Sequence, residues 1–306
     1  MNMKKLAYIA GALMLLIPAL SGAQSLSYVA ADSDAASLGM AGANLTQTGS
    51  VANASFYNAA VIPFSESKMD YAAGYTMWQP SAASSNIINA AGAININQKF
   101  GIAVGLQYGM NQAYDITDAS GSVKGQFKPS DMHINAGFAY RFLPFLSLGA
   151  NVGYATSRLA EGYSYGALAA DVFAMAKFGG VKVTAGVANI GTSMTSKSGA
   201  KFCLPGSVAL GAGYEASFAD VHSVDVALDA DYYFSGGFAA ALGAAYTFDD
   251  LVSVRAGYRY GGKSPVGSFA SVGVGGKFMG IKLDVAYLIG SDAFKNTLAL
   301  TLGYAF

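Results

Sequence analysis

The sequence predicts an all-β protein: a transmembrane antiparallel β-barrel of about 14 strands, with an N-terminal plug segment and a cleaved signal peptide. Three observations predict this class. The chain of 306 residues is 53% apolar but only 12% charged, whereas soluble domains carry about 25% charged residues. Behind its N-terminus it has no apolar run long enough for a membrane-spanning helix. Most of it alternates between large apolar residues and small or polar ones.

The composition excludes several other classes. The chain has 18 basic and 18 acidic residues, so it has no basic excess to neutralise phosphates, and we expect no nucleic-acid partner. Its apolar content excludes intrinsic disorder. Its single cysteine, Cys203, excludes a disulfide framework.

Residues 1–23 have the pattern of a secretory signal peptide. Met1–Lys5 is short and positive, Leu6–Leu20 is apolar, and small residues follow as far as Ala23. The alternative is a transmembrane anchor, which needs about 20 apolar residues. The apolar stretch Leu6–Leu20 is shorter than this and contains Pro18. We therefore expect cleavage after Ala23.

An exported chain without a spanning helix can still cross a membrane as a closed barrel, because closure satisfies every backbone polar group. This predicts a location in the outer membrane of a Gram-negative cell. Outer-membrane lipid and the barrel-insertion machinery are then the expected partners.

The alternation is clearest near the C-terminus, where Leu298, Leu300 and Leu302 share one parity and Thr297 and Thr301 share the other. A soluble β-sandwich also alternates, but its second face is in water and rich in Lys and Glu. Here that face is mostly Gly, Ala, Ser and Thr, which suits a barrel interior. Aromatic residues at strand ends on the apolar face fit interfacial girdles: Tyr154, Tyr214, Tyr246, Phe248, Tyr260 and Tyr304.

Residues 67–306 are expected to form the barrel. Its even number of strands is typical of single-chain bacterial barrels; a count of 12 stays open because the Asn-rich strand 84–97 alternates weakly. The predicted strands are 67–77, 84–97, 99–110, 132–142, 145–157, 165–178, 180–190, 205–216, 222–234, 237–248, 251–260, 267–278, 280–289 and 295–306.

The connections between these strands differ in length in a regular way. The longest, 111–131 and 191–204, follow odd-numbered strands and so fall on one side, which we interpret as extracellular. The connections after even-numbered strands are short, as periplasmic turns are expected to be.

Residues 24–66 precede the first strand and do not alternate. A barrel of this size has a lumen wider than one layer of side chains can fill, so we expect this segment to fold into the barrel as a plug. The alternative is a disordered periplasmic tail.

Charged side chains of the predicted lumen face are the main candidates for contacts with the plug or with a ligand. Positive and negative charges balance, whereas a selective ion pore would be lined by one sign. We expect Arg255 and Arg259 to pair with acidic residues two strands away; separate solvation in lumen water is the alternative. The candidates are Arg141, Asp225, Asp229, Asp231, Arg255, Arg259, Lys282 and Asp284, with Asp70, Asp171, Lys177, Lys182, Glu215 and Lys277 on the same face.

Chemical motifs give no sign of catalysis. Gly257–Ser264 fits the phosphate-loop pattern, but Pro265 and another alternating strand follow it instead of the helix that the motif needs. The two histidines, His133 and His222, lie far apart, while a metal site needs three or four ligands. Cys203 has no base nearby in the sequence. We therefore expect no cofactor, no metal and no enzymatic activity.

Short segments throughout the chain, taken together in their order and spacing, carry a resemblance to a known family: residues 37–43, 56–60, 187–191, 204–205, 208–214, 250–260, 284–287 and 295–306. In these segments the chain resembles the PorV/PorQ group of outer-membrane proteins from Bacteroidetes, within the wider FadL-like barrels. The resemblance implies a fourteen-stranded barrel with an N-terminal hatch. The family's Asn-Pro-Ala hatch motif corresponds here to Asn58, Ala59 and Ala60. The resemblance also implies that Phe306 is part of an assembly signal for barrel insertion, with a girdle aromatic as the alternative.

Two functions follow from this resemblance. The first is a non-enzymatic accessory of protein secretion or surface assembly, like those of type IX secretion, whose partners would be a translocon or surface proteins. The alternative is a FadL-like plugged channel for small hydrophobic molecules. Transport predicts a pocket between plug and wall, whereas partner binding predicts apolar patches in the outer loops.

Overall fold

The computed structural model describes residues 23–24, 26–78, 85–196, 199–290 and 296–306. Except for Ala23, the predicted signal peptide lies outside these residues. Among the residues described, no helix has the length and apolarity needed to cross a membrane.

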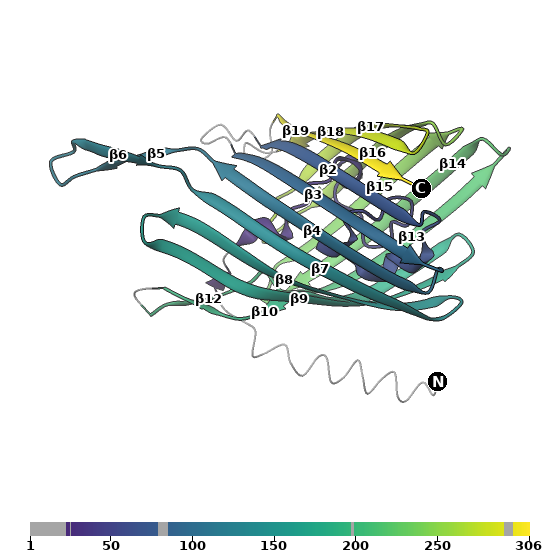
Figure 1. Ribbon diagram of the computed structural model, residues 1–306, viewed down its shortest axis with the longest axis horizontal. Coiled ribbons are helices and arrows are strands. Elements are labelled where there is room, and N and C mark those ends of the chain that lie inside the picture. The colour runs from purple at the N-terminus through teal and green to yellow at the C-terminus, as the bar shows by residue number, and fades with distance from the viewer. Residues whose placement is uncertain (1–22, 25, 79–84, 197–198, 291–295) are drawn as a thin grey trace.

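Within the described residues, fourteen strands form one closed antiparallel barrel, in which β19 pairs with β2 to complete the circle (Figure 1). The predicted fold class and strand count are confirmed, including the Asn-rich strand β3. The barrel strands are β2 (Met69–Trp78), β3 (Ser85–Ile96), β4 (Phe100–Asn111), β7 (Ser130–Leu143), β8 (Leu146–Ala160), β9 (Tyr163–Phe178), β10 (Val181–Gly191), β13 (Ser207–Phe218), β14 (His222–Tyr233), β15 (Phe238–Phe248), β16 (Val252–Tyr260), β17 (Phe269–Phe278), β18 (Ile281–Gly290) and β19 (Thr297–Ala305).

The alternating pattern divides each strand between two environments. In β19, Leu298, Leu300 and Leu302 point outward while Thr297 and Thr301 are buried. The outer face is dominated by exposed aliphatic and aromatic side chains, and all six aromatics expected in the girdles are among them. This is the surface that a barrel presents to lipid.

The last strand seals the barrel against the first. The Phe306 amide donates to the Met69 carbonyl at 3.0 Å, and the Phe306 carbonyl accepts from the amides of Lys68 and Met69. No barrel strand is therefore left with an open edge for another chain to pair with. The Phe306 side chain is exposed on the outer face, with its ring centroid 5.6 Å from that of Tyr304.

The two long connections, which we expect to be loops, contain short strands. Residues 111–131 hold the hairpin β5 (Tyr114–Thr117) and β6 (Val123–Phe127), which projects well beyond the barrel (Figure 1). Residues 191–204 hold β11 (Met194–Thr195) and β12 (Lys201–Cys203), and β1 (Ala23–Gln24) pairs in parallel with β12. These strands are too short to show alternation.

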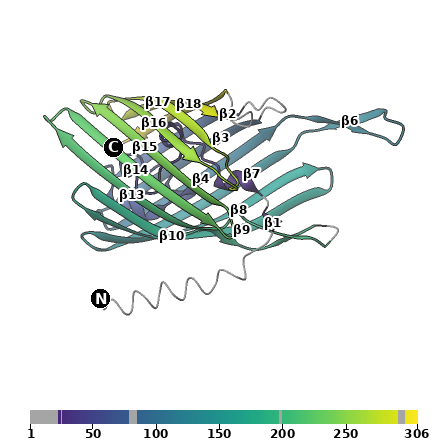
Figure 2. The same ribbon diagram turned by 180° about the vertical axis from the view of Figure 1, so that it is seen from behind.

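Both long connections lie at the same end of the barrel, as predicted, and we call it the outer end (Figure 2). The turns at the opposite, inner end are tight. At Asp249 and Asp250, for example, φ is positive at 51° and 56°, as a two-residue hairpin turn of type I′ requires.

Residues 26–66, hereafter the plug, run inside the barrel from the outer end to the inner end. They form only short helices: η2 (Ser27–Ala30), α2 (Ala35–Gly39), η3 (Ala54–Phe56) and η4 (Ala59–Phe64). Helix α2 contacts β16 to β19, whereas η4 contacts β3, β4, β7, β8 and β9 across the lumen. Most of its side chains are buried, so the segment fills the lumen instead of forming a periplasmic tail.

Glycines of the wall allow the plug to approach the strands closely. A Cβ atom on Gly149 would lie 2.3 Å from the backbone nitrogen of Ala60, and one on Gly105 would lie 2.4 Å from the Phe56 ring. Small residues on the lumen face therefore provide room for the plug.

Candidate functional site

Side chains of the barrel wall accept hydrogen bonds from the backbone of the plug. The amides of Ala35 and Ala41 donate to the hydroxyls of Thr301 and Ser271, each at 2.9 Å. Two carboxylates act in the same way.

These carboxylates belong to Asp229 and Asp70. The Leu45 amide donates to Asp229 Oδ2 at 2.9 Å, and the Val51 amide donates to Asp70 Oδ2 at 2.8 Å. A hydrogen bond to a charged acceptor stabilises by about 1.5–3 kcal/mol. Polar wall residues thus attach the plug at separate points around the lumen.

Asn58 holds the segment Asn58–Ala60, for which the sequence resemblance predicts a hatch, through hydrogen bonds of its side chain. Its Oδ1 accepts from the Ala60 amide at 2.9 Å, and its Nδ2 donates to the Leu45 carbonyl at 2.8 Å and to Thr184 Oγ1 at 3.2 Å. Asn58, Ala59 and Ala60 are all buried. The hydrogen bonds of the Asn58 side chain therefore order this segment.

Arg141 lies at the inner end of β7, beside the end of the plug. Its Nε donates to the Pro144 carbonyl at 2.9 Å, and its guanidinium carbon lies 4.7 Å from the centroid of the Phe64 ring. It thus contacts the plug through an aromatic ring and lies apart from the other charged candidates.

Among the described residues, five ion pairs on the lumen face each join two strands that have a third strand between them. Lys177 Nζ lies 3.8 Å from Glu215 Oε2, across β10. Lys182 Nζ lies 2.7 Å from Asp225 Oδ2, across β13. Lys282 Nζ lies 2.6 Å from Asp70 Oδ1, across β19. The other two pairs involve the arginines of β16.

Arg259 Nη2 lies 3.8 Å from Asp231 Oδ2, so this arginine is paired with one of the three expected aspartates. Arg255 is not: its Nη1 lies 2.6 Å from Asp284 Oδ1, over Gly275 of β17. Its expected pairing with the β14 aspartates was wrong, because Asp284 is closer across a strand that has no side chain there.

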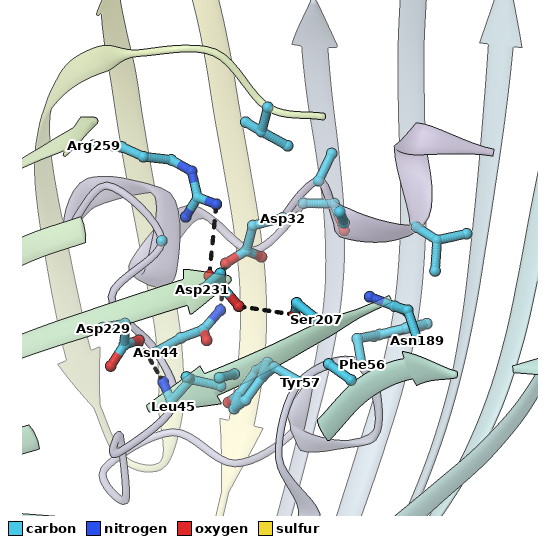
Figure 3. Close-up of a pocket in the computed structure, with 18 of the residues that line it drawn as sticks. Asp32, Asn44, Leu45, Phe56, Tyr57, Asn189, Ser207, Asp229, Asp231 and Arg259 are labelled. Carbon is cyan, nitrogen blue, oxygen red and sulfur yellow. Dashed lines mark hydrogen bonds and ion pairs between the residues drawn. The ribbon is translucent and has the colours of Figure 1, made fainter. Parts of the chain in front are cut away.

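A cavity of about 110 Å³ lies between the plug and the wall (Figure 3). An apolar cavity of about 150 Å³ binds benzene in another protein, so the size is in the range of a small aromatic molecule. Its apolar lining includes Leu38, Phe56, Trp78, Phe173, Val266 and Phe269, and its polar lining includes Asp32, Asp171, Asp229, Asp231 and Arg259.

Two further cavities flank this central one. The outer cavity, of about 250 Å³, shares Ala31, Trp78, Gln107 and Val266 with it. The inner cavity, of about 220 Å³, shares Asn44 and Tyr57 with it. The three cavities therefore follow one another along the lumen from the outer end to the inner end.

Polar residues of the plug form the boundary between the central and inner cavities. Asn44 Nδ2 donates to Asp32 Oδ2 at 2.8 Å and to Ser37 Oγ at 3.0 Å, and the Ser37 hydroxyl donates to Asp32. Asp34 caps helix α2 by accepting from the Ser37 amide at 3.1 Å. Burial, together with the charges of Asp32 and Asp284, raises the pKa of Asp34 to about 7.

Sequence reasoning missed Lys182 as the partner of Asp225, and it also missed the whole set of aromatic cavity residues. In the described part of the chain, no group of three His, Cys, Asp or Glu residues could hold a metal ion. Gly257–Ser264 spans the end of β16 and the turn beyond it, and the next element is strand β17.

No protein-family model matches the chain, and no curated protein matches it. Solved structures do match. The toluene transporter TbuX of Ralstonia pickettii has a TM-score of 0.63 and 10% identity, over 89% of this chain and 97% of its own.

Two further solved structures agree with this likeness. The toluene transporter TodX of P. putida has a TM-score of 0.60 and 13% identity, over 89% of this chain and 98% of its own. A FadL homologue of Pseudomonas aeruginosa has a TM-score of 0.55 and 13% identity, over 94% of this chain and 100% of its own.

At these identities the likeness establishes the fold alone, a closed β-barrel like those of these three proteins. Two of these three proteins are named as toluene transporters and the third as a FadL homologue, and none of the three carries the name of the PorV/PorQ group.

We predict that Lys282→Met destabilises the protein by about 3–5 kcal/mol, because it leaves the buried Asp70 carboxylate without its counter-charge. Lys277→Met is the matched control. Lys277 is 46% exposed and pairs with the exposed Asp250, so its loss should cost at most about 1 kcal/mol. Urea unfolding in detergent measures both values, and equal effects would contradict the assignment.

We predict that packing of the plug weakens as pH rises through 7. Asp34 has a native pKa of about 7, above its ordinary value of 3.8. Its contribution to stability is therefore fully present below 3.8 and is lost as pH rises through 7. Fluorescence of Trp78, the only tryptophan, reports thermal unfolding next to the plug. Asp34→Asn keeps an acceptor for the Ser37 amide, and it should flatten the dependence of the unfolding temperature on pH between 5 and 8. If this dependence is the same in Asp34→Asn as in the wild type, Asp34 is not its cause.

Proposed function

We propose that the protein is an outer-membrane channel that admits small hydrophobic molecules through a plugged lumen. The observation that carries this proposal is the central cavity, which lies between plug and wall and is lined by Phe56, Trp78, Phe173 and Phe269. A pocket in this place is what the transport hypothesis predicted.

Two further features support transport. The outer and inner cavities extend the central one toward both ends of the barrel, and each shares lining residues with it. The structural neighbours include two toluene transporters. On this proposal the apolar outer face lies in outer-membrane lipid, and the protein performs no chemical step.

An accessory role in protein secretion, of the type IX kind, is the second candidate. The comparisons favour transport over it. The observation in its favour is the projecting hairpin, where Tyr114 and Val123 are exposed and the Tyr114 hydroxyl donates to the Leu159 carbonyl at 2.8 Å. A protein that co-purifies in stoichiometric amount, and is lost when residues 112–128 are deleted, would support this second role.

Uptake of labelled toluene by cells tests the main proposal. Cells that carry the protein should take up toluene faster than cells without it. The matched control is a variant that lacks residues 112–128, because the hairpin lies outside the lumen, and its uptake should equal that of the wild type. Equal uptake with and without the protein would contradict the proposal.

Deletion of residues 24–60 tests the role of the plug separately. The plug occupies the lumen, so we expect low single-channel conductance for the intact protein and a large increase for the deletion variant. Unchanged conductance would show that the segment does not close the lumen.

A further inference from the structure

The two arginines of β16 have different environments. Arg255 makes a short ion pair, with Nη1 2.6 Å from Asp284 Oδ1. Arg259 is held loosely: its Nη2 lies 3.8 Å from Asp231 Oδ2 and 3.4 Å from the Tyr233 hydroxyl. Its side chain is only 9% exposed.

Arg259 therefore has unused hydrogen-bonding capacity inside the protein. Its Nε is buried and has no hydrogen-bond partner among the described residues. A guanidinium carries five N–H donors, and buried donors without a partner are rare in folded proteins, so each calls for an explanation. Gln107 Nε2, buried and also unpartnered among those residues, lines the same cavity.

The surroundings of Arg259 are those of a ligand site. In Figure 3 its guanidinium extends into the central cavity above Asp231. Leu38, Tyr233, Val266 and Phe269 line the cavity with it. A molecule there would meet an apolar surface together with hydrogen-bond donors.

The charges around the cavity restrict the polar group that such a molecule can carry. Four aspartates line it, against the single positive charge of Arg259: Asp32, Asp171, Asp229 and Asp231. Like charges that lie close together oppose ionisation, so a carboxylate would be repelled by this set. A neutral oxygen would accept from Arg259 without that repulsion.

We propose that the central cavity binds a small apolar molecule bearing one neutral oxygen, such as an aromatic alcohol, and that Arg259 donates to this oxygen. The inference rests on the proposed transport function and names its substrate class. A hydrocarbon without oxygen can pack against the same apolar lining, but it offers no acceptor for the Arg259 N–H donor. A site that has a buried donor for an oxygen discriminates against analogues without it.

Binding of benzyl alcohol, toluene and benzoate to the purified protein in detergent tests this, with Trp78 fluorescence as the readout. Arg259→Met should weaken benzyl alcohol binding by about tenfold and leave toluene binding within about twofold, because only the alcohol loses a hydrogen bond. Benzoate should bind more weakly than benzyl alcohol. Lys124→Met, which removes an exposed cation on the outer hairpin, is the matched control and should change neither.

Arg259→Met leaves the Asp231 carboxylate without its cation, which endangers folding. The double variant Arg259→Met with Asp231→Asn removes both charges and keeps an acceptor for Ser207, which donates to Asp231 at 3.1 Å. It should show the same selective loss of benzyl alcohol binding.

The outcomes separate the two proposals. If neither toluene nor benzyl alcohol binds to the wild type, the transport function fails, and this inference fails with it. If both bind and the Arg259 variants weaken both equally or neither, transport stands and the role of Arg259 is overturned. If benzoate binds as tightly as benzyl alcohol, the preference for a neutral oxygen is overturned.

Discussion

The structure depends on hydrogen bonds between the barrel wall and the backbone of the plug. A closed barrel of fourteen strands leaves a lumen that its own side chains do not fill, and the plug that fills it has only short helices. Its backbone amides cannot all find partners within the segment, and each buried amide left unpaired would cost about 1–3 kcal/mol. Thr301, Ser271, Asp229 and Asp70 supply the missing acceptors.

This constraint accounts for both the charges and the cavities. Asp70 accepts from the Val51 amide with one oxygen and from Lys282 with the other, so one buried side chain of the wall binds both the plug backbone and a lysine of β18. Because the plug is attached at separate points, spaces remain between the attachments. The two arginines of β16 differ in this respect: Arg255 makes a 2.6 Å ion pair with Asp284, whereas Arg259 keeps a buried Nε that has no partner among the described residues.

Much of the barrel could be predicted from the sequence, because lipid and lumen impose a period of two on every strand. The pairing of Lys182 with Asp225 could not be predicted, because it crosses Gly213 of the strand between them. The register between strands that are not neighbours depends on the stagger of the whole barrel, and this register decides which side chains meet across a third strand. The residues that line the cavity could not be predicted for a similar reason. They come both from the strands and from the plug, and the sequence of the plug has no periodic pattern that predicts its path.

Hydrogen exchange of the plug amides tests the central claim most directly. If wall side chains hold the plug backbone, the amides of Ala35, Ala41, Leu45 and Val51 should exchange as slowly as those of the barrel strands, and far more slowly than loop residues 118–122 at the tip of the outer hairpin. Exchange of these four amides as fast as that of the hairpin tip would contradict the account, because the plug would then not be fixed in the lumen.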